Sequence, residues 1–222
     1  MEENMNEEIT KEEIKKEFQI ERMILFSDAV FAIVITLMAI EIKIPESEVK
    51  ITAEALPKIL FHLMPVLLAY IVSFIFIGSI WYQHLSIFSL IKDYDKGLVV
   101  RNLVLLFFIG LFPFAASLIT RTHGLSLSLF IYVGIIMLCI LAQYILYHYI
   151  VVKRPQLRIN TEIGAHLLAL KKRKIAIICF GGSILLVFVT YTLIQTPEMK
   201  SLSSLWMLLV PLVNKILTKK RK

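Results

Sequence analysis

Four long stretches of the chain contain no charged side chain, and they restrict the fold more than any other feature of the sequence. The stretches are Ile59–Ile91, Asn102–Thr120, Thr122–Val152 and Ile175–Pro197. Each is long enough to cross the hydrocarbon core of a bilayer, which takes about 20 residues of α-helix. The hydrophobic content of 58% exceeds the roughly 45–50% that is usual for soluble domains. We therefore expect an all-α membrane protein.

Two further segments complete a prediction of six transmembrane helices. Residues 23–40 carry one charge, that of Asp28, and residues 201–214 carry none. The second segment is short, but continued to Leu217 it is long enough for a thin bilayer. The stretches do not alternate apolar and polar residues and exceed the roughly 10-residue barrel strand, so strands are disfavoured. The expected helices cover approximately residues 20–43, 57–91, 98–121, 125–152, 172–195 and 201–217.

The basic residues predict the orientation, because Lys and Arg collect on the cytoplasmic side of membrane proteins. With the N-terminus inside, the expected cytoplasmic segments hold 19 of the 24 Lys and Arg residues. The six-helix domain of residues 22–217 then lies between two cytoplasmic ends, residues 1–21 and a basic tail of residues 218–222. Residues 1–9 are predicted to be disordered, with a helix from about Lys11. The net charge of +7 favours anionic lipids at the cytoplasmic loops over nucleic acid.

The first helix carries a carboxylate, Asp28, in an otherwise apolar sequence. A charge at that depth costs a few kcal/mol to insert unless the protein pairs it. We therefore expect a buried role for Asp28 as a hydrogen-bond acceptor that ties this helix to its neighbours. Its candidate donors are Ser27, Trp81, His84 and Asn102, of which Trp and His each offer a ring N–H.

The string Arg22-x-x-x-Phe26-Ser27-Asp28 resembles the first-helix signature of the transmembrane protein 175 family of potassium channels. Further strings resemble the family's second- and third-helix motifs: Trp81-x-x-His84, Asp93/Asp95 followed by Arg101-Asn102-Leu103, and Phe112-Pro113-Phe114. The resemblance covers nearly the whole chain. A single copy of the first-helix motif is typical of the family's prokaryotic branch. It implies a multi-pass protein of the prokaryotic cell membrane that assembles as a homotetramer.

The resemblance also implies that the first helices of four subunits line a central cation pore. The implied constriction is an apolar ring at Ile33, with further rings at Leu37 and Ile40, and Thr36 is implied in ion preference. At 100° per residue, the three apolar positions lie within about 60° of one another, so they can face one axis. Asp28 lies about 140° from Ile33 and cannot line that axis. Ordinary packing produces the same spacing in many membrane helices and remains the alternative.

The sequence thus predicts a potassium-permeable channel without a cofactor. It lacks the Thr-Val-Gly-Tyr-Gly filter sequence, so a hydrophobic constriction must take the place of a carbonyl filter. A secondary transporter or a proton leak is the alternative, although no paired repeats are evident. An enzyme using Asp28 and His84 is opposed by the lack of a nucleophile elbow, a phosphate loop or metal-ligand spacing. Arg22 is either an interfacial anchor or a partner of Asp28 from another helix or subunit.

Overall fold

The computed structural model is all-helical over the residues that it describes, which are 2–40, 42–43, 56–122, 126–159 and 163–193. The helices are α1 (Glu2–Ile40), α2 (Leu56–Phe88), α3 (Lys96–Gly110), α4 (Phe112–Arg121), α5 (Ser126–His148), η1 (Tyr149–Lys153), η2 (Pro155–Leu157) and α6 (Ile163–Leu193). η1 is a turn of π-helix that continues α5, and η2 is a 3-10 turn. An antiparallel bridge between Ile91 and Arg158 joins the segment after α2 to the segment after η2.

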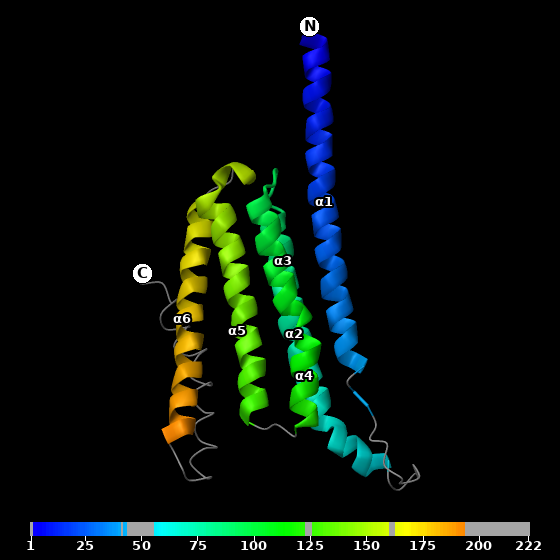
Figure 1. Ribbon diagram of the computed structural model, residues 1–222, viewed down its shortest axis with the longest axis vertical. Coiled ribbons are helices and arrows are strands. Elements are labelled where there is room, and N and C mark those ends of the chain that lie inside the picture. The colour runs from blue at the N-terminus through cyan, green and yellow to red at the C-terminus, as the bar shows by residue number, and fades with distance from the viewer. Residues whose placement is uncertain (1, 41, 44–55, 123–125, 160–162, 194–222) are drawn as a thin grey trace.

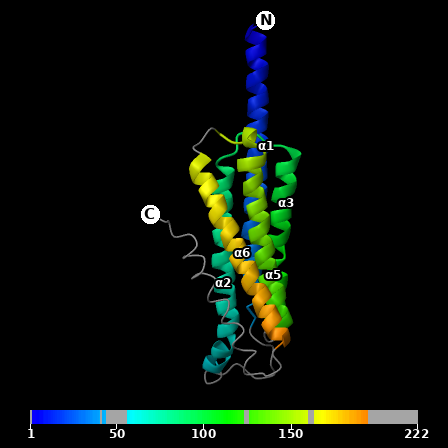
Figure 2. The same cartoon turned by 90° about the vertical axis from the view of Figure 1, so that its left-hand side faces the viewer.

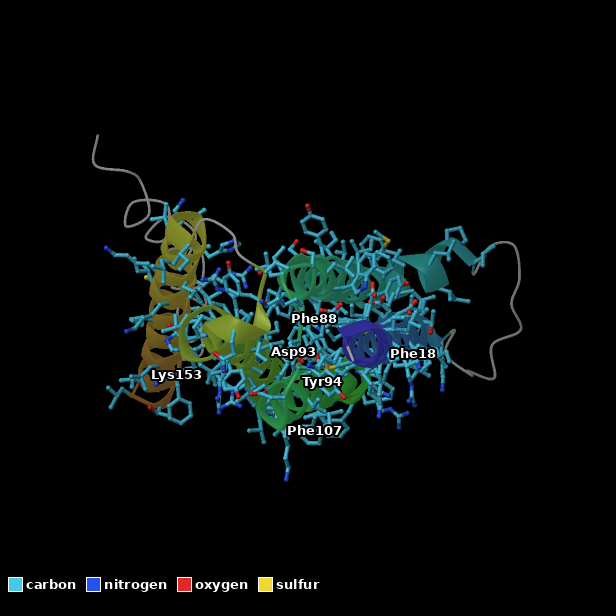
Figure 3. The ribbon with its side chains drawn as sticks, turned by 90° about the horizontal axis from the view of Figure 1, so that it is seen from above. Phe18, Phe88, Asp93, Tyr94, Phe107 and Lys153 are labelled. Carbon is cyan, nitrogen blue, oxygen red and sulfur yellow. The ribbon has the colours of Figure 1, made fainter. Side chains whose placement is uncertain are left out.

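The helices form a flattened bundle with α1 and α6 on opposite sides (Figures 1 and 3). α5 packs against α3, α4 and α6, whereas α1 packs against α2, α3 and α4. The N-terminal part of α1 projects beyond the other helices (Figures 1 and 2). Among the described residues, α1 is therefore an edge helix, and the other helices pack against one of its sides.

Four helical segments within the described residues are long and apolar enough to cross a membrane. They are Lys11–Ile40, Val66–Phe88, Lys96–Ile119 and Leu127–Lys153. Four such segments make this an all-helical, multi-pass membrane protein. The predicted sixth helix, residues 201–217, lies outside the residues that the structure describes.

Two local features of the helices have physical causes, one at Pro113 that the sequence indicates and one at the N-terminus that departs from the expectation. The predicted helix 98–121 is broken at Leu111 into α3 and α4, because Pro113 stands in the first turn of α4 and has no N–H to continue the helix before it. The prediction of disorder for residues 1–9 is wrong, since α1 begins at Glu2. Glutamates in the first turn favour a helix start through the helix dipole.

A group of polar side chains joins the start of α3 to η1, and we call Asp95, Arg101, Tyr149 and Arg154 the Asp95 cluster. Asp95 accepts a hydrogen bond from the backbone N–H of Leu98 at 2.7 Å and so caps α3. Its second oxygen accepts from the Tyr149 hydroxyl at 2.7 Å and lies 3.6 Å from Arg154 Nε. The Arg101 guanidinium lies 3.8 Å from the centroid of the Tyr149 ring. The cluster thus connects two segments that are distant in sequence.

The Asp95 cluster makes stability depend on pH. Burial acts to raise the pKa of the Asp95 carboxyl, but the hydrogen bonds from Tyr149 and Leu98 and the charge of Arg154 together lower it below its ordinary 3.8. A carboxylate whose pKa is lower in the folded state stabilises that state above about pH 4, and the contribution is lost as the pH falls through the folded pKa. We expect Asp95→Asn to have a lower Tm than the wild type at pH 7, with the difference shrinking below pH 4.

The measurement is thermal unfolding of the detergent-purified protein from pH 7 to pH 3. Asp93→Asn is the matched control, because the Asp93 side chain bonds the neighbouring N–H of Tyr94 at 2.8 Å and is not part of the Asp95 cluster. A Tm difference between Asp95→Asn and wild type that stays constant across the range would contradict this assignment.

Gly97 leaves room for the Tyr149 hydroxyl in the same cluster. A Cβ at Gly97 would overlap that hydroxyl and its ring carbon. We expect Gly97→Ala to destabilise the protein by about 1–3 kcal/mol, because overpacking outweighs the gain in helix propensity. Gly164→Ala is the control, since a Cβ there meets no atom within 4 Å. Chemical or thermal unfolding measures the stability of both variants. A Gly97→Ala protein more stable than the wild type would contradict the prediction, because it would show that Tyr149 moves aside without loss of stability.

Candidate functional site

α1 presents two different faces. Phe31, Val34 and Met38 are buried against the rest of the bundle. We call four apolar residues on another face the α1 stripe: Phe26, Ile33, Leu37 and Ile40, exposed by 53%, 55%, 44% and 60%. α1 lies at the edge of the described bundle (Figure 1), and the exposure of these four side chains places the stripe away from the packed face of the helix. The three positions expected to form the constriction thus share one uncovered face.

Thr36 lies on the exposed side of α1, next to the α1 stripe. Its hydroxyl is 3.0 Å from the carbonyl oxygen of Ala32 and 2.9 Å from that of Ile33, to which it donates. A hydroxyl has one proton and two lone pairs. With the proton directed into the helix, the oxygen presents lone pairs outward, where a cation can be coordinated.

A chain of buried polar groups holds α1 against α2 and α3. Asn102 Nδ2 of α3 donates to Ser27 Oγ of α1 at 2.8 Å, and Ser27 Oγ donates to the carbonyl of Met23 at 2.8 Å. Asn102 Oδ1 lies 2.9 Å from His84 Nε2 of α2. We call Ser27, His84 and Asn102 the polar triad, and their exposures are 0%, 0% and 1%. Three helices therefore meet at one set of hydrogen bonds.

The direction of each hydrogen bond in the polar triad can be assigned. The amide nitrogen of Asn102 is assigned to Ser27, so its oxygen accepts, and His84 Nε2 must carry the proton. The His84 ring is also held by apolar contacts, with the Phe88 ring stacked at 4.1 Å and the Phe31 ring at 5.5 Å between centroids. The position of His84 is thus defined by both packing and hydrogen bonding.

Asp28 takes a different partner from the polar triad. Trp81 Nε1 of α2 donates to Asp28 Oδ1 at 2.9 Å. Of the four donors suggested by the sequence, Trp81 is the one bonded to Asp28, while the other three bond to one another. Asp28–Trp81 therefore attaches α1 to α2, while the polar triad attaches α1 to α3 and α3 to α2.

Arg22 does not meet Asp28 within the chain. Its guanidinium lies 5.9 Å from the centroid of the Phe18 ring, on the same helix. Arg22 also lines a pocket of about 310 Å³ between α1 and α3, together with Gln19, Phe26 and Tyr94. Within the chain, Arg22 is therefore not paired with Asp28. These contacts are consistent with Arg22 as an interfacial anchor.

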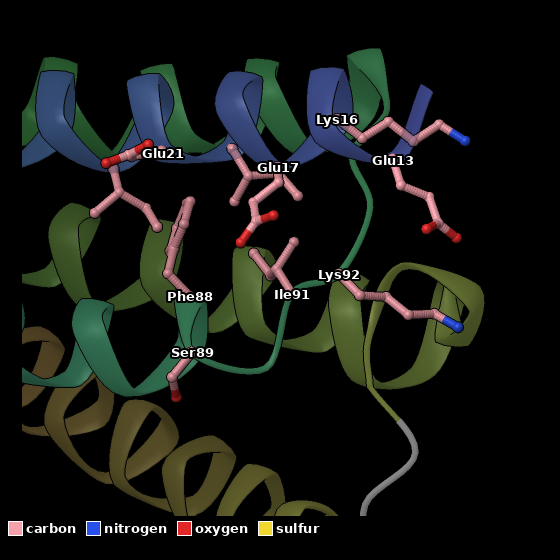
Figure 4. Close-up of a pocket in the computed structure, with 10 residues that line it drawn as sticks. Glu13, Lys16, Glu17, Glu21, Phe88, Ser89, Ile91 and Lys92 are labelled. Carbon is pink, nitrogen blue, oxygen red and sulfur yellow. The ribbon is translucent and has the colours of Figure 1, made fainter. Parts of the chain in front are cut away.

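A larger pocket of about 710 Å³ lies between the first half of α1 and the segment after α2. Glu13, Glu17 and Glu21 line it from α1, and Lys92 lines it from the other wall (Figure 4). These three carboxylates were not among the residues that the sequence predicted to form a site. Their spacing of four residues, which places them on one side of a helix, was the available signal.

The fold and these contacts define a class: an all-helical, multi-pass membrane protein with a polar junction between its first three helices. Residues 22–113 match the family described as endosomal/lysosomal potassium channel TMEM175. A potassium channel of Chryseobacterium sp. (strain P1-3) is 36% identical over 102 residues, which are 46% of this chain and 50% of that protein. A potassium channel of Chamaesiphon minutus is 38% identical over 100 residues, which are 45% of this chain and 49% of that protein.

The fold also matches a solved structure. The crystal structure of a lysosomal potassium-selective channel TMEM175 homolog from Chamaesiphon minutus aligns with a TM-score of 0.67 at 23% identity. The alignment covers 91% of this chain and 99% of that one. The chain therefore has the TMEM175 fold.

Residues 22–113 match the TMEM175 potassium channel family, and two bacterial potassium channels are similar over about the same length of chain. The resemblance drawn from the first-helix motif is confirmed. The family consists of ion channels rather than enzymes, which agrees with the lack of catalytic motifs in the sequence. The chain spans about half the length of the named relatives that it matches.

The polar triad predicts a measurable coupling between α1 and α3. Asn102→Ala leaves His84 Nε2 and Ser27 Oγ buried without their partner, so we expect the free energy of unfolding to fall by about 1–3 kcal/mol. Ser27→Ala breaks the same hydrogen bond, so the double variant should cost less than the sum of the two. Denaturant unfolding of the purified protein measures all three variants.

Ser79→Ala is the control for this cycle, because the exposed Ser79 hydroxyl donates only to the Ile75 carbonyl of its own helix, at 2.7 Å. We expect it to change stability by no more than about 0.5 kcal/mol. Additive costs for Ser27→Ala and Asn102→Ala would show that the two residues are not coupled.

Proposed function

We propose that the chain is one subunit of a homotetrameric, potassium-permeable channel in a prokaryotic plasma membrane. One observation carries the proposal: the α1 stripe is apolar and exposed at the edge of the bundle, while another face of the same helix is packed. The named relatives, which are potassium channels, support the choice of ion.

A closed ring of identical subunits gives the α1 stripe a symmetric environment. Cyclic symmetry brings the same surface of each subunit to a common axis. An edge helix with an uncovered apolar face is the element best suited to lie at that axis. Six spans with both ends in the cytoplasm complete the proposed subunit and agree with the distribution of Lys and Arg.

In the proposed pore, Ile33, Leu37 and Ile40 form successive apolar rings. Water is unstable in a narrow apolar constriction, so such rings close a pore by dewetting. No Asp or Glu of α1 lies on the α1 stripe, so an acidic ring is not part of the mechanism. The Thr36 hydroxyl oxygen lies on the exposed side of α1 beside these rings, which supports its proposed role in ion preference.

The polar triad and the Asp28–Trp81 hydrogen bond serve as the scaffold of the pore in this mechanism. The Asp28–Trp81 bond attaches α1 directly to α2, and the triad attaches α1 to α3 and, through Asn102, α3 to α2. The attachment fixes the rotation of α1 about its own axis. That rotation decides whether Ile33 or a neighbouring residue faces the pore, so the scaffold controls the constriction without touching an ion.

The proposal predicts that the polarity of Ile33 sets the flux. Ile33→Asn should raise potassium flux into proteoliposomes about tenfold, since a polar ring that keeps water in the constriction need lower the barrier by only about 1.4 kcal/mol. Ile33→Ala should raise it less, because it widens the ring but keeps it apolar. Sodium and N-methyl-D-glucamine are the control ions, and we expect no flux of the latter.

Ile75→Asn makes the same chemical change at an exposed position of α2 and should leave the flux near that of the wild type. Absence of potassium flux from every variant, in a protein shown to be a folded oligomer, would overturn the proposal. Current that follows the pH gradient rather than potassium would favour the alternative, a proton leak or a secondary transporter.

A further inference from the structure

One residue of a basic run in α6 behaves differently from its neighbours. Lys171, Lys172 and Lys174 are exposed, whereas Arg173 is turned toward the bundle and is partly buried. The Arg173 guanidinium lies 4.7 Å from the centroid of the Tyr147 ring of α5. An arginine that only marked the membrane boundary would be exposed like its lysine neighbours, so the inward orientation of Arg173 indicates a different role.

The ring beneath Arg173 makes both a hydrogen bond and a ring contact with His166. Tyr147 is buried, and its hydroxyl is hydrogen-bonded to His166 Nδ1 of α6 at 2.7 Å. The two rings also meet edge to face. The support for the guanidinium is therefore rigid, so Arg173 is positioned in advance for a ligand.

Arg173 lines a pocket of about 260 Å³ between α2, α5 and α6. Most of the wall is apolar, with Phe76 and Ile80 from α2, Ile140 from α5 and Ala176 from α6. Within the described residues, Nη1 of Arg173 is buried and has no hydrogen-bond partner. Guanidinium groups offer five donors, and a buried charged donor without an acceptor is costly.

We propose that this pocket, called here the Arg173 pocket, binds an anionic phospholipid of the cytoplasmic leaflet. The phosphate accepts hydrogen bonds from the Arg173 guanidinium, whose planar geometry suits phosphate oxygens. Part of an acyl chain lies along the apolar wall. The three exposed lysines on the same helix attract anionic headgroups to its entrance. The side of the membrane rests on the proposed orientation, but binding does not depend on ion conduction.

Native mass spectrometry of the detergent-purified full chain tests the proposal, with phosphatidylglycerol and phosphatidylcholine as the added lipids. We expect preferential binding of phosphatidylglycerol to the wild type. Arg173→Gln should weaken that binding at least about tenfold, the effect of losing charge-assisted hydrogen bonds. Lys172→Gln removes the same charge from an exposed neighbour and should weaken it much less.

A second variant tests the pocket without changing any charge. Ala176→Leu places extra volume in the apolar wall and should also reduce phosphatidylglycerol binding while leaving Arg173 intact. This variant, together with Arg173→Lys, carries the test if Arg173→Gln does not fold. Arg173→Lys keeps the charge but loses the planar fork, so we expect intermediate binding.

Equal phosphatidylglycerol binding by the wild type, Arg173→Gln and Ala176→Leu would overturn the proposal. Stabilisation by inorganic phosphate that depends on Arg173, without a preference for phosphatidylglycerol, would also overturn it and indicate a free anion site. Because lipid binding is measured without ion flux, these outcomes are independent of whether the protein conducts potassium.

Discussion

The hydrogen bonds of the polar triad are the interaction on which the rest of the candidate site depends. Ser27, His84 and Asn102 come from three different helices and are almost completely buried. The hydrocarbon core of a bilayer offers no water to an unpaired polar group, so the hydrogen bonds of His84 Nε2, the Asn102 amide and the Ser27 hydroxyl are costly to break. Only a narrow range of helix rotations and separations preserves these hydrogen bonds. The triad therefore determines which face of α1 is packed and which is left uncovered.

The orientation of α1 about its own axis gives its two faces different roles. The face bearing Phe31 and Val34 packs within the chain, and the α1 stripe is left at the edge of the bundle. Lipid can cover an apolar edge, but α1 also carries Thr36 and lies next to a polar junction. A packed face and an exposed apolar face on one helix suit the proposed channel. There, the packed face stabilises the subunit's own fold, and the exposed face lies at the axis shared by the subunits.

The opposite side of the bundle has a different character. There, α6 contributes Arg173, whose guanidinium contacts the Tyr147 ring of α5, whereas the neighbouring lysines of α6 are exposed. In our proposals, one edge of the subunit meets its copies and the other meets the lipids of the membrane. α3, α4 and α5 lie between these edges. A lipid that stabilises the packing of α5 and α6 would act on the subunit away from the pore.

The sequence by itself determined the membrane class and the family, because charge-free stretches and the first-helix motif are local features of the chain. Pro113 likewise marked the break between α3 and α4. The sequence named the donors around Asp28 but not their pairing, since Trp81, His84 and Asn102 all satisfied the same chemical requirement. It did not predict the contacts of the Asp95 cluster or of the Arg173 pocket, whose members Phe76 and Ala176 lie 100 residues apart along the chain. Only the tertiary structure decided these pairings, because packing of the helices, rather than sequence spacing, brings the groups within hydrogen-bonding distance.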